Sequence, residues 1–110
     1  MAPLIEHHLP AVKITCRRYG VVRLEVFGSA ADAESFDPER SDVDFIVRFR
    51  PGTDLGPWLA KYFDLRAELE SLLGRPVELV MDSAIRDPLF LREANRTRQL
   101  IYAAENAEAA

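Results

Sequence analysis

The chain has 110 residues, of which 48% are hydrophobic and 29% are charged, and its formal net charge is −4. This length suits one domain, and the hydrophobic fraction is sufficient for one core. The net negative charge argues against strong, general binding of nucleic acid through its phosphates. No apolar run approaches the roughly 20 residues that a membrane-spanning helix needs, so we expect no membrane contact.

The N-terminal segment and the cysteine content both favour a cytoplasmic protein. The N-terminus has no basic stretch followed by an apolar one, so it does not resemble a signal peptide. The single cysteine, Cys16, cannot form a disulfide within the chain. It lies on an apolar helical stripe, which predicts a buried structural thiol rather than a nucleophile.

The first half of the chain predicts one helix and two strands. Apolar residues at helical spacing predict a helix over 9–20, with Pro10 in its first turn and a glycine at its end. The alternating, β-branched segment 21–27 predicts a strand, and so does 42–49. The polar residues 30–40 between them fit a short helix or a loop.

The second half predicts two helices around a third strand. A loop rich in turn-forming residues covers 50–57. An apolar stripe predicts a helix over 58–73, with Trp58 on its core face. A short strand follows over 77–81, and an Asp-Pro pair opens a last helix over 88–104.

These elements predict an α/β fold of the α+β kind. A small, mixed three-stranded sheet packed with about four helices is the simplest way to bury their apolar faces. We find no internal repeat and no linker, so we expect a single domain over 1–110. Its core should span about 9–104, with a frayed N-terminus and a frayed tail.

Two aspartates at the start of the second strand suggest a metal site. Side chains two apart on a strand point to the same face, about 6.6 Å apart, which places Asp42 beside Asp44. Adjacent carboxylates repel each other unless a cation lies between them. Mg²⁺ is the usual cation when phosphate oxygens and water complete the coordination. Such a pair also occurs in exposed turns that bind nothing.

Gly28 and Ser29 follow the first strand directly. A turn at such a place points backbone N–H groups at an anion. Glycine lets a phosphate approach the backbone closely, and the serine hydroxyl adds a donor. A strand-ending turn with a serine cap would explain these two residues equally well by themselves. Together with the aspartate pair, they favour a magnesium–nucleotide site.

The segment LEVFGSAADAESFDPERSDVDFIV resembles the signature of minimal nucleotidyltransferase (MNT) domains, which belong to the DNA polymerase β-like superfamily. The matching residues are Phe27, Gly28, Ser29, Ser41, Asp42 and Asp44. Further along, LESLLGRPVELV resembles the family's leucine-rich helix, glycine turn and a strand that carries a third carboxylate, here Glu78. The resemblance covers about 21–102 and implies a nucleotidyltransferase-like fold.

The resemblance also implies an activity and a role for each matching residue. The nucleotide-binding residues would be Gly28, Ser29 and Ser41. The catalytic and metal-binding carboxylates would be Asp42, Asp44 and Glu78, holding Mg²⁺, with two ions expected. A nucleoside triphosphate, ATP, would be the substrate, and AMP would pass to an acceptor while pyrophosphate leaves.

The chain is similar, more closely, to the MntA-type antitoxins of HEPN/MNT toxin–antitoxin pairs. That similarity implies that a HEPN-domain toxin is both the partner and the acceptor. The sequence leaves the oligomeric state open, including a homo-oligomer.

Two positions depart from the family pattern and support an alternative function. Glu78 stands where aspartate is usual, which adds a methylene group and a torsion. Asp32 stands where arginine is usual, and it would repel a phosphate if it pointed inward. The alternative is a catalytically degenerate nucleotide-binding module that neutralises a partner by contact. Trp58, Tyr62 and Phe63 could belong to such a contact surface, although the helical core is the favoured location for them.

Three arginines near the C-terminus also have two interpretations. Arg92, Arg96 and Arg98 could approach a phosphate group or an acidic partner. A solvated helix face is the simpler explanation for such a set.

Overall fold

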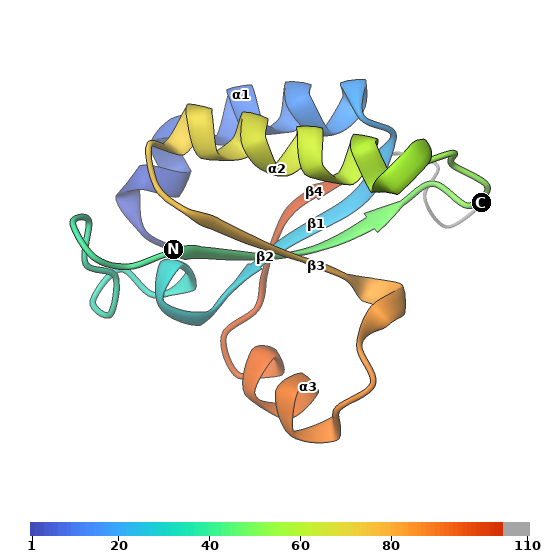
Figure 1. The fold of residues 1–110 in the computed structure, drawn as a ribbon. Helices are drawn as coiled ribbons and strands as arrows, with labels where there is room; N and C mark the ends of the chain where they lie inside the picture. Colours follow the sequence, from blue (N-terminus) through green and yellow to red (C-terminus); the bar gives the residue numbers. More distant parts are fainter. Residues whose placement is uncertain (105–110) are drawn as a thin grey trace.

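The computed structural model describes residues 1–104 of the chain. A four-stranded sheet lies at its centre, with two helices on one face and a third helix on the other (Figure 1). The strands are Val21–Phe27 (β1), Val43–Phe49 (β2), Val77–Met81 (β3) and Gln99–Ala103 (β4). The α-helices are Pro3–Arg18 (α1), Ala60–Leu73 (α2) and Pro88–Asn95 (α3), and the 3-10 helices are Gly28–Ala31 (η1), Pro57–Leu59 (η2) and Asp82–Ala84 (η3). Within 1–104, no helix is long and apolar enough to cross a membrane.

The sheet is mixed, as predicted, and the α+β class is confirmed. Its strand order is β3-β2-β1-β4, with β2 and β3 parallel and β1 antiparallel to both of its neighbours. The prediction of three strands and about four helices is wrong, because the end of the predicted last helix forms β4. Apolar and aromatic residues favour a strand there, and Ile101 is buried in the core.

Helices α1 and α2 cover one face of the sheet and enclose the main core (Figure 1). Alternate residues of β2 supply the centre of this core: Val43, Phe45 and Val47 are fully buried. Leu65 and Leu69 of α2 meet them from above and are equally buried. The predicted inward alternation of β2 is therefore confirmed.

Helix α1 begins at Pro3 rather than at Leu9, so the predicted helix start and the predicted frayed N-terminus are wrong. Proline suits the first turn, where its missing N–H would have no helical partner. Ile5 is fully buried, and the Ala2 N–H donates to the Ala30 carbonyl at 2.9 Å. Pro10 therefore lies inside the helix. The predicted frayed tail lies outside the described residues.

Helix α2 begins at Ala60, so the prediction that Trp58 packs into the core is wrong. Trp58 and Leu59 both have a left-handed φ of 57°, which interrupts the helical path before α2. The Trp58 side chain is 93% exposed, and that of Phe63 is 49% exposed. Tyr62 is half-buried, and its hydroxyl donates to the Leu79 carbonyl.

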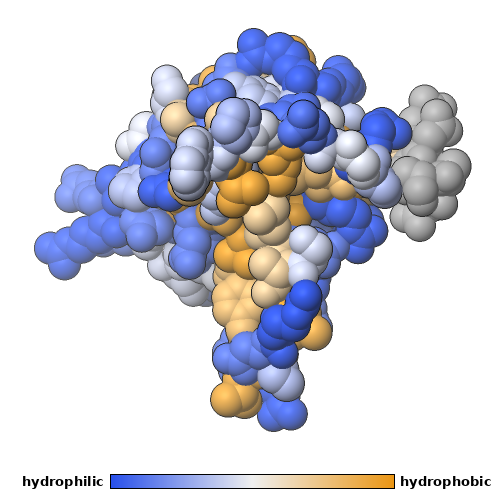
Figure 2. All heavy atoms as spheres, turned by 45° about the vertical axis from the view of Figure 1, so that its right-hand side comes forward, coloured by the Kyte–Doolittle hydropathy of each residue, from blue (hydrophilic) through white to orange (hydrophobic). Residues whose placement is uncertain are grey.

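Helix α3 packs against the other face of the sheet through a smaller apolar cluster. The buried members of this cluster are Phe27, Ile46 and Ala94. Phe90 of α3 meets Phe27 edge-on, with ring centroids 5.5 Å apart. Seen from the side of η3, apolar side chains form a band that runs from beneath the upper helices down to α3 (Figure 2). This second face is only partly covered, and its open part contains the predicted site.

Cys16 lies on the buried side of α1. It is fully buried, and burial raises the pKa of its thiol to about 12. A thiol that stays protonated at neutral pH is a poor nucleophile. The predicted structural role of Cys16 is therefore confirmed.

Candidate active site

The turn at Gly28 touches a carboxylate of the neighbouring strand. Phe27, the last residue of β1, is paired with Asp44 of β2. Gly28 has a φ of +72°, a left-handed conformation that glycine adopts without steric cost. A Cβ atom at Gly28 would lie 2.8 Å from Oδ2 of Asp44. Glycine is therefore required here both by the backbone angle and by the space.

Asp44 and Glu78 lie side by side on the partly covered face. They are paired in register across the parallel strands β2 and β3, so their side chains point the same way. The pKa of Asp44 is raised to about 6, mainly by burial and then by the neighbouring Glu78 and, more weakly, by Asp42. Two neighbouring carboxylates form a site whose repulsion a divalent cation would relieve.

Asp42 lies just outside this pair. It precedes β2, its side chain is exposed, and it lines an open groove of about 270 Å³ together with Glu78, Tyr62 and Arg66. Within residues 1–104, no three His, Cys, Asp or Glu side chains converge to hold a metal ion by themselves. Mg²⁺ commonly binds one or two carboxylates and takes its remaining ligands from phosphates and water, so the donor set of Asp44 and Glu78 fits it.

The two serines of the predicted nucleotide site have different surroundings. Ser29 lies in η1 beside Gly28 and is half-buried. The Ser41 hydroxyl accepts a hydrogen bond from the Asp37 N–H at 2.9 Å, and the Ser41 carbonyl accepts one from Nε of Arg75 at 3.0 Å. Ser41 thus orders the loop before β2, and its contact with a nucleotide stays a prediction.

Asp32 is held within its own loop. Its carboxylate accepts hydrogen bonds from the Ser35 hydroxyl at 2.8 Å and from the Glu34 N–H at 3.0 Å. These bonds, led by that of Ser35, keep the pKa of the exposed Asp32 below its usual value. The acid at this position therefore stabilises a local turn.

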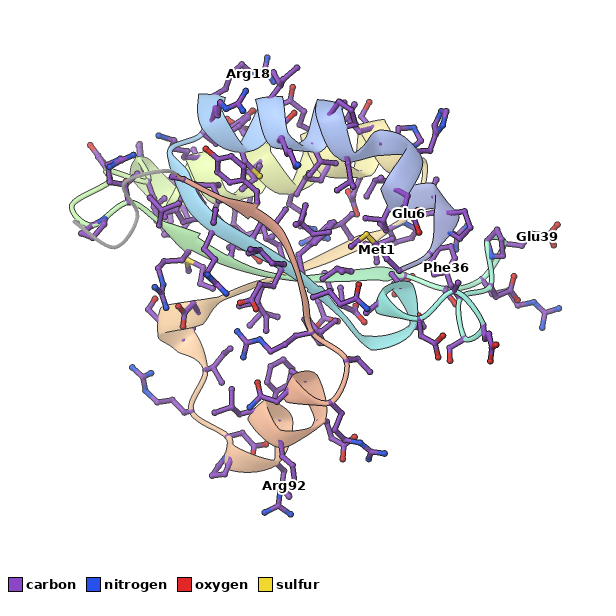
Figure 3. All side chains as sticks on the ribbon, turned by 180° about the vertical axis from the view of Figure 1, so that it is seen from behind. Met1, Glu6, Arg18, Phe36, Glu39 and Arg92 are labelled. Atoms are coloured by element: carbon purple, nitrogen blue, oxygen red, sulfur yellow. The ribbon has the colours of Figure 1, made fainter. Side chains whose placement is uncertain are left out.

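The three C-terminal arginines do not form a cluster. Arg92 of α3 is exposed and points away from the sheet (Figure 3). Arg96 lies 3.5 Å from Glu93 in an exposed ion pair. Arg98 alone reaches the sheet, where its Nη2 and Nε lie 2.6 and 3.0 Å from the two carboxylate oxygens of Glu25.

Two further contacts near the site were not predicted from the sequence. The Gly28 N–H donates to Oγ1 of Thr97 at 2.8 Å, and the buried Glu25 receives the Arg98 guanidinium. The hydrogen bonds from Arg98 hold the pKa of Glu25 below its usual range. These partners are 69 and 73 residues apart in the chain, so no local spacing could reveal them.

Comparison with known proteins identifies the class. Residues 11–101 match the family model described as nucleotidyltransferase domain. Protein adenylyltransferase MntA of Thermococcus cleftensis is 42% identical over 83 residues, which cover 74% of this chain and 78% of that protein. A solved structure provisionally described as a minimal nucleotidyltransferase is 32% identical, with a TM-score of 0.67, over 86% of this chain and 90% of its own.

A more distant structure shares only the fold. It contains a tri-AMPylated Shewanella oneidensis HEPN toxin in complex with an MNT antitoxin. The matched chain is 14% identical, with a TM-score of 0.62, over 94% of this chain and 76% of its own.

The chain therefore belongs to the nucleotidyltransferase domain family, and it is a nucleotidyltransferase. Within that family it is a minimal nucleotidyltransferase of the MntA kind, which confirms the resemblance found in the sequence.

Proposed function

We propose that this protein is a Mg²⁺-dependent adenylyltransferase that transfers AMP from ATP to a HEPN-domain toxin and thereby acts as its antitoxin. The observation that carries the proposal is the contact between the Gly28 turn and Asp44, beside Glu78. It combines a turn that a phosphate can approach with carboxylates that suit a metal ion. The names of the relatives, a protein adenylyltransferase and an MNT antitoxin bound to an AMPylated toxin, support the choice of reaction and partner.

The turn after β1 would bind the triphosphate. Gly28 has no side chain to block a phosphate, and Ser29 offers a hydroxyl and a backbone N–H in the same 3-10 turn. Asp44 and Glu78, with Asp42 at the groove, would hold Mg²⁺. Bound there, Mg²⁺ would stabilise charge on the phosphate oxygens during transfer.

The acceptor would approach from the side of β3. This strand is the edge of the sheet next to β2, and the groove lined by Asp42 and Glu78 opens beside it. An acceptor hydroxyl lying in that groove would attack the α-phosphate. A bond forms between the acceptor oxygen and the α-phosphorus, the bond to the β-phosphate oxygen breaks, and pyrophosphate leaves. The hydroxyl proton would pass to a carboxylate of the groove or to water.

A transfer assay tests this proposal. Purified protein is incubated with Mg²⁺ and α-labelled ATP, alone and with the HEPN product of an adjacent reading frame. We expect label on the partner, its loss with a chelator, and its loss in the double variant Asp42→Ala/Asp44→Ala. Asp64→Ala, which removes an exposed acid from α2, is the matched control and should leave labelling unchanged. γ-Labelled ATP should give no labelled partner.

The same assay distinguishes the proposed transferase from the alternative, a catalytically degenerate binding module. Mg²⁺-dependent ATP binding without any labelled partner, together with inhibition of the toxin on mixing, would show a degenerate module that acts by contact. The variant Glu78→Asp then decides whether the longer side chain is the cause. If Glu78→Asp gains labelling activity, the extra methylene group is what holds the carboxylate out of place.

A further inference from the structure

Three consecutive residues at the corner between α3 and β4 reach back to the end of β1 and to η1. Oγ1 of Thr97 accepts the Gly28 N–H at 2.8 Å. The Arg98 guanidinium binds the carboxylate of Glu25. Nε2 of Gln99 donates to the Ala31 carbonyl at 3.0 Å. The glycine turn is therefore held from a distant part of the chain.

The Thr97 hydroxyl is itself held in position. It is half-buried, and it lies 3.5 Å from the Ala94 carbonyl, to which it can donate while it accepts from Gly28. This arrangement turns an oxygen lone pair toward the Gly28 N–H. The adjacent salt bridge between Arg98 and Glu25 joins the start of β4 to β1. It limits the movement of the corner between α3 and β4.

The hydrogen bond between Gly28 and Thr97 determines which backbone N–H groups of the turn remain free to bind a phosphate. The sequence suggested that N–H groups of the turn point at an anion, but the Gly28 N–H is already bound by Thr97. Triphosphate oxygens are therefore left to Ser29 and to the metal ion. The task that remains for Gly28 is to keep its Cα close to Asp44.

We propose that Thr97 is a positioning residue for nucleotide transfer, because its Oγ1 holds the Gly28–Ser29 turn over Asp44 in the conformation that binds the triphosphate. The inference rests on the proposed function. Glycine has the largest conformational freedom of any residue, so a turn built on Gly28 needs an outside contact to stay in one conformation. Thr97 supplies that contact without touching the nucleotide.

The test compares three variants in the transfer assay. Thr97→Val keeps the shape of the side chain and removes the acceptor, and Thr97→Ser restores the hydroxyl. Thr53→Val is the matched control, because it removes a threonine hydroxyl that donates to the Arg50 carbonyl in a loop far from the site. We expect kcat to fall about tenfold in Thr97→Val, as for the loss of one backbone hydrogen bond to a half-buried donor. Thr97→Ser should stay within about twofold of the parent, and Thr53→Val should be unchanged.

Amide hydrogen exchange of Gly28 gives a second readout that needs no activity. We expect exchange of this amide to quicken about tenfold in Thr97→Val and to recover in Thr97→Ser. Gln99→Leu, which removes only the bond to Ala31, should show the same change to a smaller extent, and it replaces Thr97→Val if that variant does not fold.

The two readouts keep this inference separate from the proposed function. If the parent protein transfers no label, the proposed function fails, while Gly28 exchange still decides whether Thr97 holds the turn. Unchanged Gly28 exchange in the valine variant would overturn the inference, and so would an unchanged kcat in an active enzyme. A tighter complex with ATP in Thr97→Val would also overturn it, because Thr97 would then compete with the phosphate for the Gly28 N–H.

Discussion

The two faces of the sheet use the same strand in opposite ways. On the face beneath α1 and α2, β2 contributes Val43, Phe45 and Val47, all fully buried. On the other face, the intervening residues Asp44 and Ile46 belong to the site and to the small cluster under α3. Because successive side chains of a strand point to opposite faces, β2 places its core residues on one face and its site residue Asp44 on the other.

The difference between the faces also explains their electrostatics. The helix-covered face is apolar, so its contribution to stability should change little with pH. The open face carries the half-buried Asp44, whose ionised form is disfavoured by burial and by the neighbouring acids. The same face carries the Glu25–Arg98 ion pair, which is stabilising. On this one face, the Asp44 carboxyl therefore lowers stability and the neighbouring ion pair raises it.

Phe45→Ala should give the largest effect on stability. Truncating a fully buried phenylalanine costs about 3–5 kcal/mol through lost burial and the cavity left behind. Urea unfolding measures the free energy of unfolding. Nucleotide affinity of the molecules that remain folded should be unchanged, because Phe45 faces away from the site. A variant that keeps its stability and loses nucleotide binding would contradict the division between the faces.

Asp44→Asn, at the neighbouring position, should have the opposite effects: it should reduce activity and raise stability. Loss of a metal-binding carboxylate should reduce transfer by at least about a hundredfold. The pKa of Asp44 is about 6, above its usual 3.8, so this group lowers the free energy of unfolding progressively between about pH 4 and pH 6, and the full penalty is present above about pH 6. Asparagine removes that penalty. Discounted for solvent screening, the gain at pH 8 is about 1 kcal/mol, or about 4–8 °C in Tm.

The pH dependence provides the control for this prediction. Near pH 4 the folded Asp44 is protonated and the unfolded one is only partly ionised, so the stabilisation by Asp44→Asn should be much smaller there than at pH 8. Calorimetry at pH 4 and pH 8 in the absence of Mg²⁺ measures the change. An equal gain at both pH values would mean that the carboxyl charge is not its cause.

Arg98→Ala should show that the Glu25–Arg98 ion pair on the open face is stabilising. It leaves Glu25 buried without its main partner, at a cost of about 2 kcal/mol at pH 7. The pKa of Glu25 is lowered in the fold, so its stabilising effect is present above its usual 4.5 and is lost as the pH falls through its folded value. Stability of the variant should therefore depend less on pH in the acidic range. Parallel acid-unfolding curves for the parent and the variant would refute this role of Arg98.

Gly28→Ala should separate backbone strain from crowding at the site. Alanine at a φ of +72° costs about 1–2 kcal/mol, and its Cβ would press on Asp44. Gly52→Ala has a φ of +79° with no atom within 4 Å of the new Cβ, so it carries the same strain alone. Both variants should lose similar stability, and Gly28→Ala alone should bind Mg²⁺–ATP about tenfold more weakly. Equal binding by both would show that contact with Asp44 is unimportant.

Much of the site could be predicted from the sequence, because its signals are local. Gly28 follows a strand, Asp44 opens another, and Glu78 lies at a recognisable place beyond a glycine turn. The register of parallel strands β2 and β3 then brings Asp44 and Glu78 together. Asp42 precedes β2 and is exposed, so its part in metal binding stays a prediction.

The missed features depend on contacts that no local pattern contains. Residues 99–103 fitted a helical continuation, and only pairing with β1 makes them a strand. Trp58 shares helical spacing with α2, but two left-handed residues interrupt the helix before it. Thr97 gains its role solely from a hydrogen bond to Gly28 across the fold.

The most direct test of the central claim is to map the nucleotide on the two faces. Titration of isotopically labelled protein with Mg²⁺ and a non-hydrolysable ATP analogue would be followed through its amide resonances. We predict that the largest shifts fall on Gly28, Ser29, Asp44 and Glu78, depend on Mg²⁺, and disappear in Asp44→Asn. Shifts confined to α1, α2 or the 50–57 loop, or binding that is unchanged in Asp44→Asn, would contradict the assignment of the open face as the nucleotide site.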